Sequence, residues 1–209
     1  MILAIDIGNT NIVIGCCADG QVIFRERVST NPTATVLEYA AMLKMAFDMN
    51  RADITAVDGA ILSSVVPAVT LTMRDAVHKY LHLTPLVVGP GIKTGLRIHI
   101  DNPAQLGSDL VVDAVAGIHH YPLPQIIIDM GTATTFSVID QHGFYVGGMI
   151  TAGMAISAEA LVRSTSQLSK VDFEKPKKLI GTNTVDCVKS GLLYATACSI
   201  DGMAERIEA

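Results

Sequence analysis

Apolar residues along this chain fall into short runs that are separated by small polar turns. The first run leads into Asp6, and a turn over residues 8–11 follows before a second apolar run begins. Two apolar runs around a Gly/Asn-rich turn predict a β-hairpin. Residues 126–139 repeat this design, with Asp129 at the end of an apolar run and a hydroxyl-rich turn after it. The internal repeat predicts two similar halves.

The same patterning predicts the remaining elements. Alternating or short apolar runs predict strands over residues 21–28, 56–63, 84–88 and 144–151. Helical spacing predicts helices over 35–50, from Pro67 onward, over 154–163, and from a capping Thr184 onward. The polar, proline-bearing residues 164–178 predict a mobile loop.

A further helix is predicted to start at Asn102. Asn102 can act as the N-cap, Pro103 suits the first helical position, and Gln105 completes a capping-box arrangement. Asp109 and Asp113 are four residues apart, so this helix would present both on one face. An aspartate on a helix is most often a solvated surface residue, but Gly107 beside Asp109 favours a functional role.

These elements predict an α/β fold with two domains, residues 1–118 and 119–209, which meet at the segment 119–122. Both halves begin with three predicted strands, which are followed by a predicted helix. The second half lacks the further strands and helices that a full copy of the first would need, so we expect its domain to be incomplete.

Composition and charge narrow the classes of function. The chain has 209 residues, half of them apolar, and a net charge of −5 without a basic cluster, which argues against nucleic acid as a main partner. We see no signal peptide and no membrane span, and therefore expect a cytosolic protein. The four cysteines have no C-x-x-C spacing, so we expect reduced thiols rather than a zinc site.

The repeated Asp-x-Gly turn is the strongest chemical signal. A carboxylate at a strand end can hold a cation while the N–H groups of the turn face phosphate oxygens, although a single Asp-x-Gly is also an ordinary hairpin turn. Two copies could hold the metal and phosphates of one nucleotide. The loop 89–95 is no dinucleotide fingerprint, because Thr94 occupies the place of the third glycine, and no Walker A motif occurs. This loop is a plain turn or the wall of a substrate pocket.

The motifs, taken in order, resemble the type III pantothenate kinases of the acetate and sugar kinase/Hsp70/actin superfamily. The resemblance covers essentially the whole chain. It is carried by residues 6–11 (DIGNTN), 63–67 (SSVVP), 89–95 (GPGIKTG), 101–103 (DNP) with 106–109 (LGSD), 129–134 (DMGTAT), and 181–184 (GTNT) with 190–191 (SG).

This resemblance implies two RNase H-like (actin-like ATPase) domains that face a central nucleotide cleft. It implies ATP-dependent phosphorylation of pantothenate to 4′-phosphopantothenate, the first step of coenzyme A biosynthesis. ATP with Mg²⁺ and a monovalent cation, K⁺ or NH₄⁺, would be required, and the protein would be a homodimer. Membrane and nucleic-acid partners are not implied.

The resemblance also implies the roles of individual residues. Asp109 would be the catalytic base, and Asp129 would bind the monovalent cation. Asp6 would help to bind the Mg²⁺–phosphate group of ATP. ATP would be bound by Asp6, Ile7, Gly8, Asn9, Thr10, Asn11, Ile12, Val13 and Thr132. Pantothenate would be bound by Ile100, Gly107, Ser108, Asp109, Leu110 and Thr184.

Two alternatives stay open on the sequence. Members of the family often carry Arg and Tyr where this chain has Leu110 and Ile100, which supports a kinase of the same superfamily with another small alcohol as acceptor. A Pro-Gly pair of the family is replaced by Ala152-Gly153. The other alternative is a non-catalytic regulatory protein that resembles the Bvg accessory factors. The presence of Asp6, Asp109 and Asp129 favours the enzyme.

Overall fold

The computed structural model describes all residues, Met1–Ala209. The chain divides into two compact units, unit 1 over Met1–His120 and unit 2 over Tyr121–Ala209. The division falls two residues after the predicted boundary at 118/119. The predicted nucleotide cleft between domains stays a prediction.

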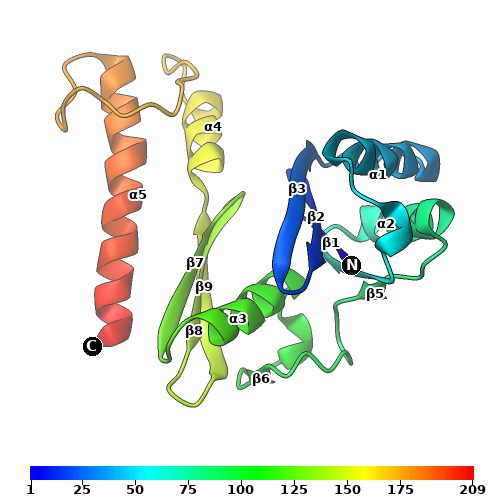
Figure 1. The fold of residues 1–209 in the computed structure, drawn as a ribbon. Coiled ribbons are helices and arrows are strands. Elements are labelled where there is room, and N and C mark those ends of the chain that lie inside the picture. Colours follow the sequence, from blue (N-terminus) through cyan, green and yellow to red (C-terminus); the bar gives the residue numbers. More distant parts are fainter. The chain divides into compact units, whose positions relative to one another are not determined.

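Unit 1 is built on a five-stranded sheet with the strand order β3-β2-β1-β4-β5 (Figure 1). The strands are β1 (Ile2–Ile7), β2 (Asn11–Ala18), β3 (Gln21–Ser29), β4 (Gly59–Ser64) and β5 (Leu86–Val87). β2 is antiparallel to both of its neighbours, whereas β4 runs parallel to β1 and β5 parallel to β4.

The two faces of this sheet differ because side chains alternate along a strand. Leu3, Ile5 and Ile7 point to one face and are buried with α1 (Val36–Asn50) and α2 (Pro67–Leu81). Figure 1 shows α1 and α2 together on that side of the sheet. Residues 4 and 6 alternate with the buried ones and point to the other face, where α3 (Ser108–His120) contacts β4.

Unit 2 begins with three antiparallel strands in the order β9-β8-β7. They are β7 (Gln125–Met130), β8 (Ala133–Ile139) and β9 (Phe144–Ala152), and they are followed by α4 (Met154–Ser164) and α5 (Thr184–Glu208). The small buried core contains Phe136, Ile139, Tyr145 and Leu192. In residues 121–209 there are no counterparts of β4 and β5. None of the helices is both long and apolar enough to cross a bilayer.

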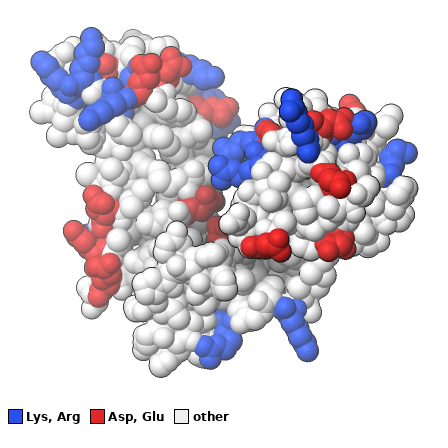
Figure 2. Space-filling view, viewed as in Figure 1, with Lys and Arg blue, Asp and Glu red and all other residues white.

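Residues 165–183 connect α4 to α5 without a helix or strand. Figure 2 shows Lys and Arg side chains gathered over this connection, and lysines 170, 175, 177 and 178 belong to it. Lys189 of α5 forms an ion pair with Glu174 at 2.9 Å, and the Ser190 hydroxyl donates to the carbonyl oxygen of Leu179. The connection is therefore attached to the first turns of α5.

The structure corrects the predicted helix at Asn102. Asn102 caps only a 3₁₀ turn over Pro103–Gln105. The backbone is extended at Leu106, and α3 begins at Ser108. The capping signal is local and is satisfied by one short turn, whereas the helix start is fixed by bonds to β4. As a result, Asp109 lies in the first turn of its helix instead of the second.

Smaller corrections concern the ends of other elements. Thr184 is the first residue of α5 and not its cap; the Asn183 side chain accepts a hydrogen bond from the backbone N–H of Asp186, because Asn is the better N-cap residue. The strand predicted over 56–63 begins only at Gly59, after a 3₁₀ turn over Ile54–Ala56. Of the strand predicted over 84–88, only the two residues of β5, Leu86–Val87, form a strand. The short β6 (Arg97–Ile98) was not predicted.

Candidate functional site

The β1–β2 hairpin presents Asp6 and the turn that follows it. The N–H of Gly8 donates to the carbonyl oxygen of Asn11 at 2.9 Å and closes the turn. Asp6, Asn9 and Thr10 are exposed. In contrast, the side chains of Ile7 and Ile12 are fully buried in the core, so these two predicted ATP-binding residues can offer a ligand only their backbone groups.

The β7–β8 hairpin repeats this geometry with one residue fewer in the turn. Ile7 pairs with Ile12 across the first turn, and Met130 pairs with Thr134 across the second. The N–H of Gly131 donates to the carbonyl oxygen of Ala133 at 2.9 Å. Asp129 is exposed at the end of β7, as Asp6 is at the end of β1. The predicted repeat is thus confirmed at the level of the hairpins.

A glycine from the start of α4 packs directly on the second turn. The N–H of Gly153 donates to the carbonyl oxygen of Thr132 at 3.1 Å. A Cβ on residue 153 would lie 2.3 Å from the carbonyl oxygen of Gly131 and 2.4 Å from that of Thr132. Only glycine permits this approach. The turn that carries Thr132 is therefore supported by the start of α4.

Asp109 has a fixed orientation at the start of α3. Its Oδ1 accepts a hydrogen bond from the backbone N–H of Leu110 at 2.8 Å. A Cβ on Gly107 would come within 2.4 Å of the same Oδ1, so glycine at 107 leaves room for this side-chain position. The backbone therefore holds Oδ1 and fixes the direction of the carboxylate.

Ser108 ties the start of α3 to the end of β4. Its hydroxyl accepts from the backbone N–H of Ser64 and donates to the Ser64 carbonyl oxygen, both at 3.0 Å, and it lies 3.2 Å from the hydroxyl of Ser63. Ser63 is in turn the register partner of Asp6 on β1. Asp6 and the start of α3, where Asp109 is the second residue, therefore lie at the same edge of the sheet in unit 1.

The Ser108 hydroxyl has a structural role. The side chain is 8 % exposed and its hydroxyl is bonded to β4, and the predicted contact of Ser108 with the substrate stays a prediction. Neither Ser108 nor Ser63 was predicted to connect these elements. The pair Ser63-Ser64 at a strand end was visible in the sequence, but its partner lies 44 residues further on.

The glycine-rich loop 89–95 lines a cavity of about 230 Å³ in unit 1. Ser108 and Val111 of α3 form another part of the wall, and Ile92, Ile98 and Leu106 make it largely apolar. Of the two readings of this loop, the pocket wall agrees with the structure. Ile100 and Leu110 are half-buried, and neither lines this cavity.

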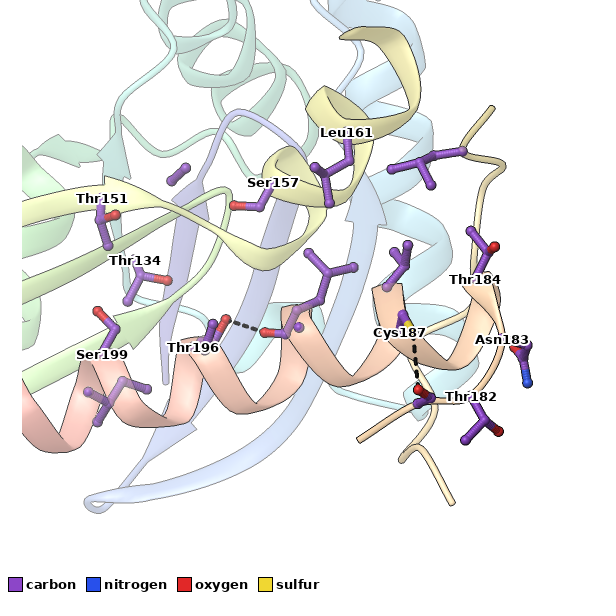
Figure 3. Close-up of a pocket in the computed structure, with 18 of the residues that line it drawn as sticks. Thr134, Thr151, Ser157, Leu161, Thr182, Asn183, Thr184, Cys187, Thr196 and Ser199 are labelled. Carbon is purple, nitrogen blue, oxygen red and sulfur yellow. Dashed lines mark hydrogen bonds between the residues drawn. The ribbon is translucent and has the colours of Figure 1, made fainter. Parts of the chain in front are cut away.

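Unit 2 contains a larger groove, of about 910 Å³, between α5 and the strands β8 and β9. Figure 3 shows Thr134 and Thr151 of the strands facing Thr196 and Ser199 of α5 across it. The exposed Thr184 lies at one end, beside Thr182 and Asn183. No charged side chain lines this groove, so it offers hydroxyl groups and apolar surface but nothing that would neutralise phosphates.

The sequence model of the type III pantothenate kinases matches residues 2–206. The chain belongs to the type III pantothenate kinase family. Type III pantothenate kinase from Halalkalibacterium halodurans is 42% identical over 209 residues, which is 100% of this chain and 82% of the relative. The enzyme of the same name from Koribacter versatilis is 42% identical over 217 residues, covering 99% of this chain and 79% of that one.

Solved structures support the actin-like ATPase fold. The activator of 2-hydroxyisocaproyl-CoA dehydratase from Clostridium difficile, with bound ADPNP, has a TM-score of 0.55 at 10% identity, covering 99% of this chain and 75% of that one. A conserved protein from Campylobacter jejuni, described as a Baf family transcriptional activator, has a TM-score of 0.56 at 15% identity. The match covers 96% of this chain and 78% of that one. At such identities the likeness concerns the fold alone.

Proposed function

We propose that this protein transfers the γ-phosphoryl group of ATP to the primary hydroxyl of pantothenate and forms 4′-phosphopantothenate, the first step of coenzyme A biosynthesis. The proposal rests on the family match over residues 2–206. It is supported by Asp109, whose carboxylate is oriented by the Leu110 N–H at the sheet edge that also carries Asp6. The regulatory alternative is not favoured, since the relatives that align with the whole of this chain are named as kinases.

Asp109 would act as the base. As the pantothenate oxygen forms its bond to the γ-phosphorus, the bond from that phosphorus to the β,γ-bridging oxygen breaks and ADP leaves. The hydroxyl proton passes to Oδ2 of Asp109, because Oδ1 is held by the Leu110 N–H. Phosphoryl transfer depends mainly on positioning and charge stabilisation, so a fixed carboxylate is sufficient as an acceptor of the proton.

The first hairpin would bind the phosphates and the second a monovalent cation. Asp6 would help to bind the Mg²⁺–phosphate group, Asp129 would bind K⁺ or NH₄⁺, and Thr132 would contact ATP. No group of three or more His, Cys, Asp or Glu side chains is placed to hold an ion. Single exposed carboxylates fit cations that take their other ligands from phosphate, water and backbone oxygens. Mg²⁺, when bound with ATP, offsets charge on the β- and γ-phosphates.

The acceptor would lie beside the start of α3. The largely apolar cavity between the loop 89–95 and Val111 suits the geminal methyl groups of pantothenate. Gly107 leaves room near Asp109, and we keep Ile100, Leu110 and Thr184 as proposed contacts of the acceptor. The homodimer remains a prediction from the resemblance, and the cytosolic location remains a prediction from the sequence. Sedimentation of the purified protein tests the first.

The test is a phosphorylation assay with ATP and pantothenate, with and without K⁺, on the wild type and Asp109→Asn. We expect Asp109→Asn to lower turnover by about a hundredfold to ten-thousandfold while ATP binding persists. Asp113→Asn, one turn further along α3, is the matched comparison and should lose far less. Equal activity of wild type and Asp109→Asn would remove Asp109 from the role of base.

Other outcomes separate the alternatives. Wild-type protein that binds ATP and phosphorylates a different small alcohol would assign another acceptor, in line with Leu110 and Ile100 at positions where the family often has polar side chains. Wild-type protein without turnover of any alcohol would favour the regulatory alternative. Asp129→Asn should abolish the activation by K⁺ if Asp129 binds the cation.

A further inference from the structure

Thr30, the residue directly after β3, forms two hydrogen bonds to the turn of the first hairpin. Its hydroxyl donates to the carbonyl oxygen of Gly8 at 2.6 Å, and its backbone N–H donates to the carbonyl oxygen of Thr10 at 2.9 Å. The hydroxyl bond is partly buried and joins residues 22 positions apart. The turn is thus held from the end of a neighbouring strand in addition to its own closing bond from Gly8 to Asn11.

These two bonds fix the direction of two peptide groups. In a trans peptide, the carbonyl of one residue and the N–H of the next point in opposite directions. The Gly8 carbonyl faces Thr30, so the N–H of Asn9 points away from Thr30. The Thr10 carbonyl also faces Thr30, so the N–H of Asn11 points away as well. The N–H groups of Asn9 and Asn11, on either side of Thr10, are therefore not directed at Thr30, and backbone N–H groups presented by a turn can bind an anion.

We propose that Thr30 is a positioning residue for ATP: its hydroxyl holds the Gly8 carbonyl so that the N–H groups of the turn face the phosphates. The inference rests on the proposed function in taking ATP as the ligand of this turn, but it is independent of the acceptor. Thr30 touches no ligand itself and acts through Gly8. The hydroxyl, and not the methyl group, is the part of the side chain that matters.

The test compares variants that differ in the hydroxyl alone. Thr30→Val keeps the shape and the backbone N–H but loses the donor, so we expect the KM for MgATP to rise about threefold to tenfold, the value of one hydrogen bond. The KM for pantothenate should not change. Thr30→Ser should restore ATP binding. Thr33→Val is the matched control, because its hydroxyl donates to Asn31 at an exposed site in the following loop.

Binding of MgATP and MgADP, measured by the ligand-induced shift of the melting temperature, gives a readout that needs no acceptor. If the wild type fails to phosphorylate pantothenate but Thr30→Val still weakens nucleotide binding, the proposed function fails and the role of Thr30 stands. If Thr30→Val does not fold, Thr30→Ser and Thr30→Ala form the test pair. They too differ by the hydroxyl only.

Two results would overturn the proposal. One is a folded Thr30→Val that binds MgATP as tightly as the wild type, or equal ATP affinity in Thr30→Ser and Thr30→Ala. The other is a parallel loss of affinity for ATP and for pantothenate, which would show that Thr30 supports the fold of unit 1 in general and not the phosphate turn in particular.

Discussion

The hydroxyl of Ser108 lies 3.0 Å from both the backbone nitrogen and the backbone oxygen of Ser64. This relationship fastens the first residue of α3 to the last residue of β4. These two bonds also position the neighbouring residue, Asp109, at the edge of the sheet. Removing the hydroxyl therefore tests how the base is held.

Ser108→Ala should lower the free energy of unfolding by about 1–3 kcal/mol, because the partly buried N–H of Ser64 loses its acceptor. Denaturant unfolding of the variant and the wild type measures this difference. Turnover should fall less than in Asp109→Asn, since the carboxylate itself remains. A variant as stable as the wild type would show that water replaces the hydroxyl without cost.

Gly107→Ala should reduce turnover without reducing stability. The added Cβ would meet Oδ1 of Asp109 at 2.4 Å, and the carboxylate, as the end of a flexible side chain, can move away at little cost in folding free energy. The displaced base would then be misplaced for proton transfer, a geometric error that costs up to about a hundredfold in rate. Steady-state kinetics and a thermal melt measure both effects. Unchanged kcat in Gly107→Ala would contradict the proposed orientation of Asp109.

Gly153→Ala should damage the second hairpin. Its Cβ would meet two backbone oxygens of residues 131 and 132 at 2.3 and 2.4 Å, and backbone cannot yield as a side chain does. We expect a loss of about 1–3 kcal/mol in unfolding free energy. ATP binding should weaken because Thr132 shifts.

Gly202→Ala in α5 is the control for this substitution. Its Cβ would lie 3.2 Å from Nη1 of Arg206, the mobile end of a long side chain, and Ala is favoured over Gly inside a helix by about 0.5–1 kcal/mol. This variant should therefore be at least as stable as the wild type. A Gly153→Ala protein with the stability of Gly202→Ala would disprove the close approach.

The capping box at the start of α1 predicts a pH dependence of stability. The Thr35 N–H and hydroxyl donate to Oε2 of Glu38 at 2.7 and 2.8 Å, and these bonds lower the pKa of Glu38 below its ordinary value of 4.5. A carboxyl group whose pKa is lowered by folding stabilises the folded state at pH values above the pKa that it has in the unfolded chain. That contribution is lost as the pH falls through the folded value.

Wild type should therefore exceed Glu38→Gln in unfolding free energy at neutral pH, and the difference should vanish in acid well below pH 4.5. Denaturant unfolding at both pH values measures it. Thr35→Ala, which removes the cap, should cost about 1 kcal/mol at neutral pH. A pH-independent gap between wild type and Glu38→Gln would contradict the assignment.

The hairpins and most helices could be predicted because their signals are local. The apolar runs on both sides of Gly8 and of Gly131 specify strands, and the turn residues specify where the chain reverses. The ordered motifs around Asp6, Asp109 and Asp129 were sufficient to indicate the family, which the match over residues 2–206 confirms. Element ends were less accurate, as Asn183 and Gly59 show.

The sequence by itself thus determined which residue types stand at the strand ends and in the turns, since strand period and turn chemistry act over a few residues. Only the tertiary structure decided where α3 begins and what Ser108 and Thr30 do. Their hydroxyls bond to partners 44 and 22 residues away. Such bonds arise when strands and helices pack, and no local pattern encodes them. For the same reason, only the structure showed that the side chains of Ile7 and Ile12 are buried in the core.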